Sequence, residues 1–177
     1  MNMNRFSVLT AMILAGTAAR LIPHPPNFSP IASLALFGGA TFASKRAAFL
    51  VPLTAMFLSN LVLGFSAITP VIFGSFALIT CLGFWVRRNP TVGRLAAASV
   101  ASAVLFFTLS NFGMWALEDW YPKTPAGLAE CYAAAIPFFR NTLWSNLFFS
   151  AVLFGGLALA ERRWPWLAEP TPARASS

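Results

Sequence analysis

Six stretches of this sequence are almost free of charge and are long enough, or nearly long enough, to cross a lipid bilayer as α-helices. They cover residues 6–22, 31–42, 47–63, 67–86, 95–117 and 142–160. A spanning helix needs about 20 mostly apolar residues. Only 10% of the 177 residues are charged and 58% are hydrophobic, too much apolar surface for a water-soluble core of this size. The sequence therefore predicts an all-α membrane protein, a bundle of about six transmembrane helices.

We expect one transmembrane domain over residues 1–163 and a polar cytoplasmic tail over residues 164–177. Proline clusters and Gly64 mark the breaks between spans, and residues 118–141 form the longest predicted connection. Stretch 31–42 is the shortest, because its residues give about 18 Å of helix against a hydrocarbon core of about 30 Å. A re-entrant segment is the alternative, but a crossing sorts the charges better, so we expect this helix to extend into its flanks.

Basic residues gather at one set of span ends, which predicts the orientation of the bundle. With the N-terminus inside, Arg20, Lys123 and Arg140 lie outside, and nine of the twelve Lys and Arg residues lie inside: Arg5, Lys45, Arg46, Arg87, Arg88, Arg94, Arg162, Arg163 and Arg174. This matches the positive charge of cytoplasmic loops, so both termini are predicted to be cytoplasmic. Residues 6–19 also fit a cleaved signal peptide, but the apolar run continues to Ile22, which favours a span.

Strongly polar uncharged residues lie in the outer halves of the predicted spans. Asn111, Trp115 and Glu118, for example, share one helix face at i, i+4, i+7 spacing. An unpaired amide is costly in lipid, so such groups either bond neighbouring helices or line an outward-facing pocket. The candidate substrate-binding residues are His24, Asn27, Asn60, Asn111, Trp115, Tyr121, Arg140 and Asn141.

Enzyme and metal signatures are missing from the sequence. His24, the single histidine, has no companion ligands, so no metal site is predicted, and it is either a solvated loop residue or a lid over the pocket. There is no H-E-x-x-H, G-x-S-x-G or phosphate-loop motif, and the charges lie at span ends. We therefore expect no catalytic residue and no cofactor. The net charge of +7 is scattered over the span ends, so nucleic acid is not an expected partner.

Ala11, Ala15 and Ala19 recur at four-residue spacing in the first span. Small residues in register form a flat stripe that lets another helix approach closely. The stripe either packs within its own bundle or docks a partner membrane protein.

Several blocks extend over most of the chain: R-L-I-P-H-P-P-N-F-S-P-I (20–31), A-L-F-G-G-A (35–40), L-S-N-L-V-L-G-F (58–65), N-F-G (111–113), Y-P-K-T (121–124) and C-Y-A-A-A-I-P-F-F-R-N-T (131–142). In these blocks the chain resembles a family of small bacterial membrane proteins of unassigned function. That family is similar in layout to the S components of energy-coupling-factor vitamin transporters. One departure is Asn60, which stands where that pattern would carry Asp.

This resemblance implies a six-helix bundle in the bacterial inner membrane that binds a vitamin-like solute at its outer face, with cobalamin among the candidates. It also implies that Ala11, Ala15 and Ala19 meet an energy-coupling membrane subunit. Our leading hypothesis is a transport protein that binds a vitamin-like or other small organic solute in an outward-facing pocket. The alternative is an assembly or scaffold subunit with no small-molecule ligand.

Overall fold

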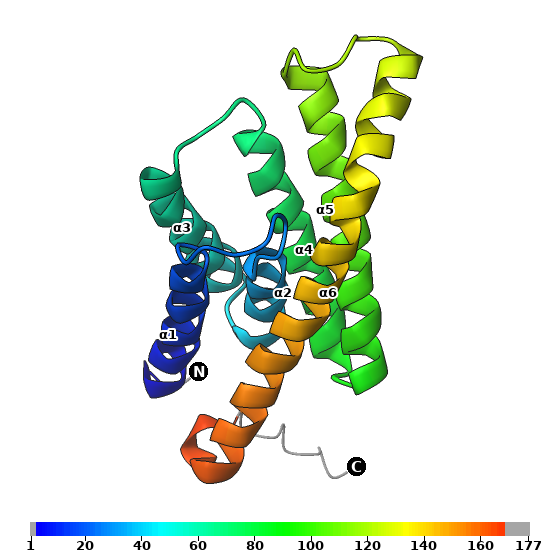
Figure 1. The fold of residues 1–177 in the computed structure, drawn as a ribbon. Helices are drawn as coiled ribbons and strands as arrows, with labels where there is room; N and C mark the ends of the chain where they lie inside the picture. Colours follow the sequence, from blue (N-terminus) through cyan, green and yellow to red (C-terminus); the bar gives the residue numbers. More distant parts are fainter. Residues whose placement is uncertain (1–2, 169–177) are drawn as a thin grey trace.

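The computed structural model describes residues 3–168 of the chain, and this part is all-α. Six helices run up and down in sequence order (Figure 1). They are α1 (Met3–Ala19), α2 (Ile31–Thr41), α3 (Lys45–Leu63), α4 (Thr69–Arg88), α5 (Val92–Leu117) and α6 (Pro125–Arg163), followed by a short 3-10 helix, η1 (Pro165–Leu167). The predicted fold class, an all-α bundle of six helices, is confirmed.

Four helices, α3 to α6, are long and apolar enough to cross a membrane. The chain is therefore a multi-pass membrane protein. The other two helices are shorter, with 17 residues in α1 and 11 in α2. The predicted first span, residues 6–22, lies three residues too far along the chain, because α1 runs from Met3 to Ala19, and Leu21 and Ile22 lie in an exposed turn ahead of Pro23.

Helix α2 is the centre of the bundle. It contacts all five other helices, which surround it in Figure 1. Nine of its 11 residues are buried, as expected for a helix that is apolar on every side. The expected extension of this helix into its flanks is wrong, because α2 begins directly after Pro30 and ends before Phe42. Its length of about 17 Å is sufficient because protein, not lipid, surrounds it.

Adjacent glycines let α2 lie very close to its neighbours. A Cβ atom at Gly83 of α4 would come within 2.7 Å of the Cα of Gly39, and a Cβ at Gly39 would overlap the carbonyl oxygen of Thr80. A Cβ at Gly38 would lie 2.6 Å from Cγ of Pro52 in α3. Small residues permit such close approach of membrane helices. Helix α2 is thus held between α3 and α4 at backbone contact distance.

The predicted connection over residues 118–141 is wrong, because most of it belongs to α6. This helix starts at Pro125 and runs for 39 residues to Arg163. Thr124 caps it by accepting a hydrogen bond from the amide of Gly127, and proline is well tolerated in a first turn. Pro137 interrupts the apolar pattern but not the helix, which reaches about 58 Å. Figure 1 shows the upper part of the α5–α6 hairpin extending beyond the other helices.

Arg5 ties the beginning of α1 to the end of α6. Its Nη1 lies 2.6 Å from Oε1 of Glu161 and also donates to the carbonyl oxygen of Leu167 in η1. The Arg5 side chain is only 8% exposed and that of Glu161 30%. The two helix ends therefore lie at the same end of the bundle.

Most basic residues gather at this end of the bundle. Eight of the nine that the sequence assigns to the inner side lie at or near helix termini here, and the ninth, Arg174, lies outside the described residues. We call this the basic end. The predicted polar tail starts with η1, and residues 169–177 also lie outside the described part of the chain.

Four buried polar side chains join α2, α5 and α6. Ser33 Oγ donates to the carbonyl oxygen of Asn146 at 3.1 Å, and Asn146 Nδ2 donates to the carbonyl oxygen of Ser99 at 3.4 Å. The hydroxyls of Ser99 and Ser150 lie 2.9 Å apart. All four residues are at most 2% exposed. Asn146 therefore bonds neighbouring helices, one of the two roles expected for the amides.

Asn146→Ala should lower the free energy of unfolding by about 1 kcal/mol, the usual size of an interhelical hydrogen bond in a membrane protein. Unfolding by sodium dodecyl sulfate in mixed micelles measures this change. Asn4→Ala removes an exposed amide from α1 and is the matched control, expected to change stability little. Equal stability of the two variants would contradict a stabilising role for Asn146.

Candidate functional site

A cavity of about 200 Å³ lies at the end of the bundle opposite the basic end. The loop over residues 20–30, the beginning of α2, and parts of α4, α5 and α6 enclose it. Its lining residues are Arg20, His24, Asn27, Ser29, Ile31, Ala32, Ile72, Phe76, Phe106, Thr142 and Ser145. This cavity, which combines polar groups on one wall with apolar groups on another, is the candidate site.

Arg20 provides the charge in the cavity. Its Nη1 donates to Oγ of Ser59 and to Oδ1 of Asn60, both at 2.7 Å. Asn60 is buried at the end of α3, so this pair fixes the guanidinium in one position. Within residues 3–168, no carboxylate forms an ion pair with Arg20.

The loop over residues 20–30 is held in place from α6. Asn141 Nδ2 donates to the carbonyl oxygen of Pro26 at 3.0 Å, and Ser145 Oγ donates to that of Ser29 at 3.1 Å. The Phe28 ring packs against Phe148 and Phe149 with centroid distances of 6.1 and 5.7 Å. The loop is therefore a fixed wall of the cavity.

Two predicted residues, Asn27 and His24, lie on this wall. Asn27 has a φ of 60°, a left-handed conformation that asparagine adopts more readily than most residues, so the backbone also favours asparagine here. His24 Nδ1 lies 2.7 Å from the carbonyl oxygen of Ile22. Because a carbonyl only accepts, Nδ1 carries the proton in the neutral ring, and Nε2 is left as an acceptor.

Aromatic and aliphatic side chains form the opposite wall. Phe76 and Phe106 stack with ring centroids 5.6 Å apart and an interplanar angle of 8°. Ile31 and Ile72 complete the apolar surface. The hydroxyl of Ser29 is buried and has no hydrogen-bond partner in the described part of the chain.

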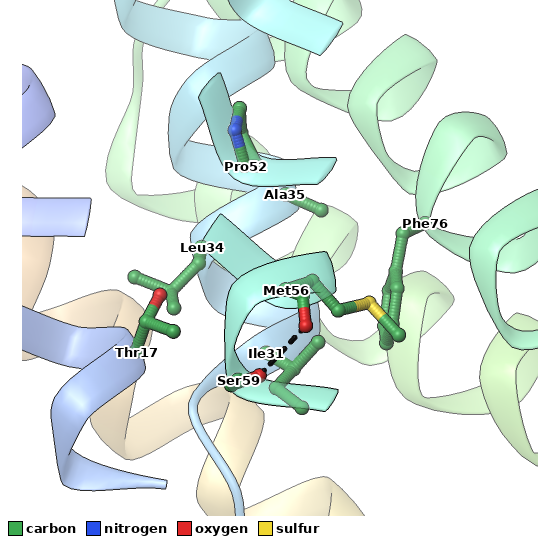
Figure 2. Close-up of a pocket in the computed structure, with 8 residues that line it drawn as sticks. All are labelled: Thr17, Ile31, Leu34, Ala35, Pro52, Met56, Ser59 and Phe76. Carbon is green, nitrogen blue, oxygen red and sulfur yellow. Dashed lines mark hydrogen bonds between the residues drawn. The ribbon is translucent and has the colours of Figure 1, made fainter. Parts of the chain in front are cut away.

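A second, much smaller pocket adjoins the cavity, and the two share Ile31 and Phe76. Figure 2 shows Met56 reaching toward the ring of Phe76, with Ile31 and Ser59 beside it. Its volume of about 10 Å³ has room for a single water molecule at most. Ser59 lines the small pocket and connects it to Arg20 of the cavity, because its hydroxyl donates to the carbonyl oxygen of Met56 at 2.8 Å and accepts from Arg20.

The predicted site residues divide into two groups. His24 and Asn27 line the cavity. Asn60 accepts a hydrogen bond from Arg20, and Asn141 donates one to the loop over residues 20–30, but neither asparagine is a lining residue. The remaining residues lie on the α5–α6 hairpin, where Trp115 Nε1 donates to the carbonyl oxygen of Pro122 at 2.9 Å. Asn111, Tyr121 and Arg140 belong to this hairpin as well and are not lining residues of the cavity.

Asn111 bonds within the hairpin rather than across a pocket. Its Nδ2 donates to the carbonyl oxygen of Phe107 at 2.7 Å. The main-chain carbonyl oxygen of Asn111 lies 3.4 Å from Sγ of the buried Cys131. Among residues 3–168 there is no group of three or more His, Cys, Asp or Glu residues that would hold a metal ion.

Arg20 and the Phe76–Phe106 pair are the site features that sequence reasoning missed. The sequence places Arg20 among the outer basic residues and gives no pattern that distinguishes the two phenylalanines from the others. One signal was available for Arg20, because it lies inside the predicted first span, and an ionisable residue within a membrane span is a candidate functional residue by default. Pairing of Phe76 with Phe106 depends on how α4 and α5 pack, which residue spacing alone does not give.

The alanine stripe of α1 faces away from the bundle. Leu9, Ile13 and Thr17 form the buried face of this helix. Ala11 and Ala15 are exposed on the other side. Ala19, the third residue of the stripe, is half-buried, so only Ala11 and Ala15 are free of packing against the described helices.

A protein-family model described as a family of unknown function, DUF6580, matches residues 1–168. Neither the search of curated proteins nor the search of solved structures finds a match.

Proposed function

Because the chain belongs to the DUF6580 family, whose function is unknown, its role has to be inferred from its own residues, and we propose that this membrane protein binds a small organic solute in the cavity beside Arg20. The observation that carries the proposal is the composition of the cavity. A fixed guanidinium, the polar side chains of His24 and Asn27, and a stacked aromatic pair line one concave, partly open space. A concave, largely apolar pocket with a few convergent polar groups is typical of small-molecule sites.

The orientation of the bundle supports uptake from outside. Eight basic residues at the opposite end favour a cytoplasmic basic end, and with that orientation the cavity would face the outer side of a bacterial inner membrane. At about 200 Å³ the cavity is smaller than the roughly 300–1,000 Å³ typical of drug-sized ligands, so it favours a small vitamin over cobalamin. With no phosphate-loop motif in the sequence, uphill transport would need energy from a partner subunit.

Filling the cavity should weaken solute binding. We expect Ile72→Trp, which enlarges a lining side chain, to lower solute affinity at least about tenfold, since a bulky ring would occupy the ligand volume. Native mass spectrometry in mild detergent, followed by calorimetric titration with a panel of small vitamins, measures the affinity. Leu78→Trp is the matched control, because Leu78 lies on the same helix and is 50% exposed.

The panel separates the outcomes. Saturable binding that Ile72→Trp removes and Leu78→Trp retains would support the proposal. Absence of binding by the wild-type protein, or equal affinities of the two variants, would count against a solute site in this cavity.

A scaffold role is the second candidate function, and the outward-facing alanine stripe favours it. The same stripe would serve an energy-coupling subunit of a transporter. In native membranes, Ala15→Trp should then remove a partner that copurifies with the wild-type protein. A partner that is lost with Ala15→Trp but kept with Ile72→Trp would support docking through α1.

A further inference from the structure

We propose that the solute is a small acid, with a carboxylate that pairs with Arg20 and an apolar body that packs against Phe76 and Phe106. This inference rests on the proposed function of the cavity and names the class of ligand. It is carried by the unused hydrogen-bonding capacity and the uncompensated charge of Arg20.

The guanidinium of Arg20 is anchored by one nitrogen and open at the other two. An arginine side chain has five N–H donors, of which two belong to Nη1. Both Nη1 donors are used, by Ser59 and Asn60. Nε and Nη2 make no hydrogen bond to residues 3–168, yet neither is among the buried unpartnered atoms, so both remain accessible. These two nitrogens form the parallel pair of donors that binds a carboxylate in a bidentate manner.

The charge of Arg20 is not neutralised by the protein. Its two side-chain partners are a hydroxyl and an amide, which are neutral. Arg5 shows the contrast, because that buried guanidinium is paired with Glu161. A partly buried charge favours an opposite charge nearby, and the ligand is the remaining source of one.

The rest of the cavity fits a short apolar body. The stacked rings of Phe76 and Phe106, together with Ile31 and Ile72, provide apolar contact surface opposite the polar wall. A volume of about 200 Å³ restricts the body to about one ring or a short chain.

The same chemistry, an anionic group on an apolar body, also occurs in anionic phospholipids. The cavity lies at one end of a membrane-spanning bundle, where a lipid phosphate would be within reach. The experiment therefore has a soluble-acid arm and a lipid arm.

The soluble arm uses matched pairs that differ only in charge. Wild-type protein in phosphatidylcholine nanodiscs is titrated with nicotinate against nicotinamide, and with benzoate against benzamide. We expect each acid to bind about ten- to a hundredfold more tightly than its amide, the usual range for a charge-assisted hydrogen bond. The lipid arm compares lipid retained on the protein, by native mass spectrometry, in nanodiscs that contain phosphatidylglycerol.

Asn60→Asp is the most informative variant. The new carboxylate replaces an amide of the same shape that already accepts a hydrogen bond from Arg20. The contact is therefore kept, while the charge of the Arg20 guanidinium is now neutralised by the protein itself. The acid preference should then disappear while the amides bind as before. Arg20→Gln should give the same result, and Lys123→Gln, which removes an exposed basic residue on the α5–α6 turn, should change nothing.

The outcomes distinguish this inference from the proposed function. Acid preference that both variants abolish supports the inference, and phosphatidylglycerol retention with the same dependence supports it with lipid as the ligand. Equal binding of acids and amides overturns the inference and leaves the cavity as a solute site. Failure of every probe, neutral or charged, and of the lipid overturns both. If Arg20→Gln does not fold, the wild-type pairs and Asn60→Asp still decide.

Discussion

Gly39→Ala is expected to lower the free energy of unfolding by about 3 kcal/mol or more, the upper range for overpacking a well-packed core. A Cβ atom at this position would overlap the carbonyl oxygen of Thr80, which is backbone and has no alternative rotamer. Helices α2 and α4 would therefore have to move apart along their whole contact. Unfolding in mixed micelles, followed by circular dichroism, measures the change.

Gly74→Ala is the matched control for this prediction. Gly74 lies in α4, but nothing lies within 4 Å of a Cβ built there. Alanine is also the better helix former, by about 0.5–1 kcal/mol. This control should be neutral or slightly more stable than the wild-type protein. Equal effects at Gly39 and Gly74 would show that the close approach of α2 and α4 is not a determinant of stability.

Glu161→Ala is expected to destabilise the protein by about 3 kcal/mol, the lower end of the range for breaking a buried ion pair. The variant leaves the guanidinium of Arg5, only 8% exposed, without its carboxylate. The lower end applies because Glu161 itself keeps 30% exposure. Unfolding in mixed micelles again provides the measurement.

The double variant Arg5→Met, Glu161→Ala tests the mechanism. If the cost comes from an unpaired buried charge, removing the charge as well should restore part of the lost stability. A double variant less stable than Glu161→Ala would instead indicate that Arg5 acts mainly through its hydrogen bond to the carbonyl oxygen of Leu167. Arg162→Ala, on the next residue of α6, is the control for a change at this end of the helix.

Helix content and helix number were predictable from the sequence because they depend on local composition. Long apolar runs separated by Pro, Gly and charge identify the helices without reference to their neighbours. The failures occur where tertiary contacts decide. Pro137 is tolerated inside α6, and α2 is shorter than any span because other helices surround it.

The site was predictable only in part. His24 and Asn27 could be expected near a pocket because their loop connects two helix ends, and the cavity indeed includes both. Asn111 and Trp115 have the same polar character, but they bond within the α5–α6 hairpin. Distinguishing the two groups requires knowing that α6 begins at Pro125, well before Asn141. The interruption of the apolar pattern ahead of Asn141 hides this part of the helix.

The burial of α2 has a consequence for the biogenesis of the protein. As a helix of about 17 Å that ends at Thr41, shortly before the charged residue Lys45, it is too short to be a stable span by itself when it leaves the ribosome. Its strongest packing partner, α4, is synthesised later. We therefore expect α2 to wait at the insertion machinery until α3 and α4 have emerged, so that these helices enter the bilayer as one unit.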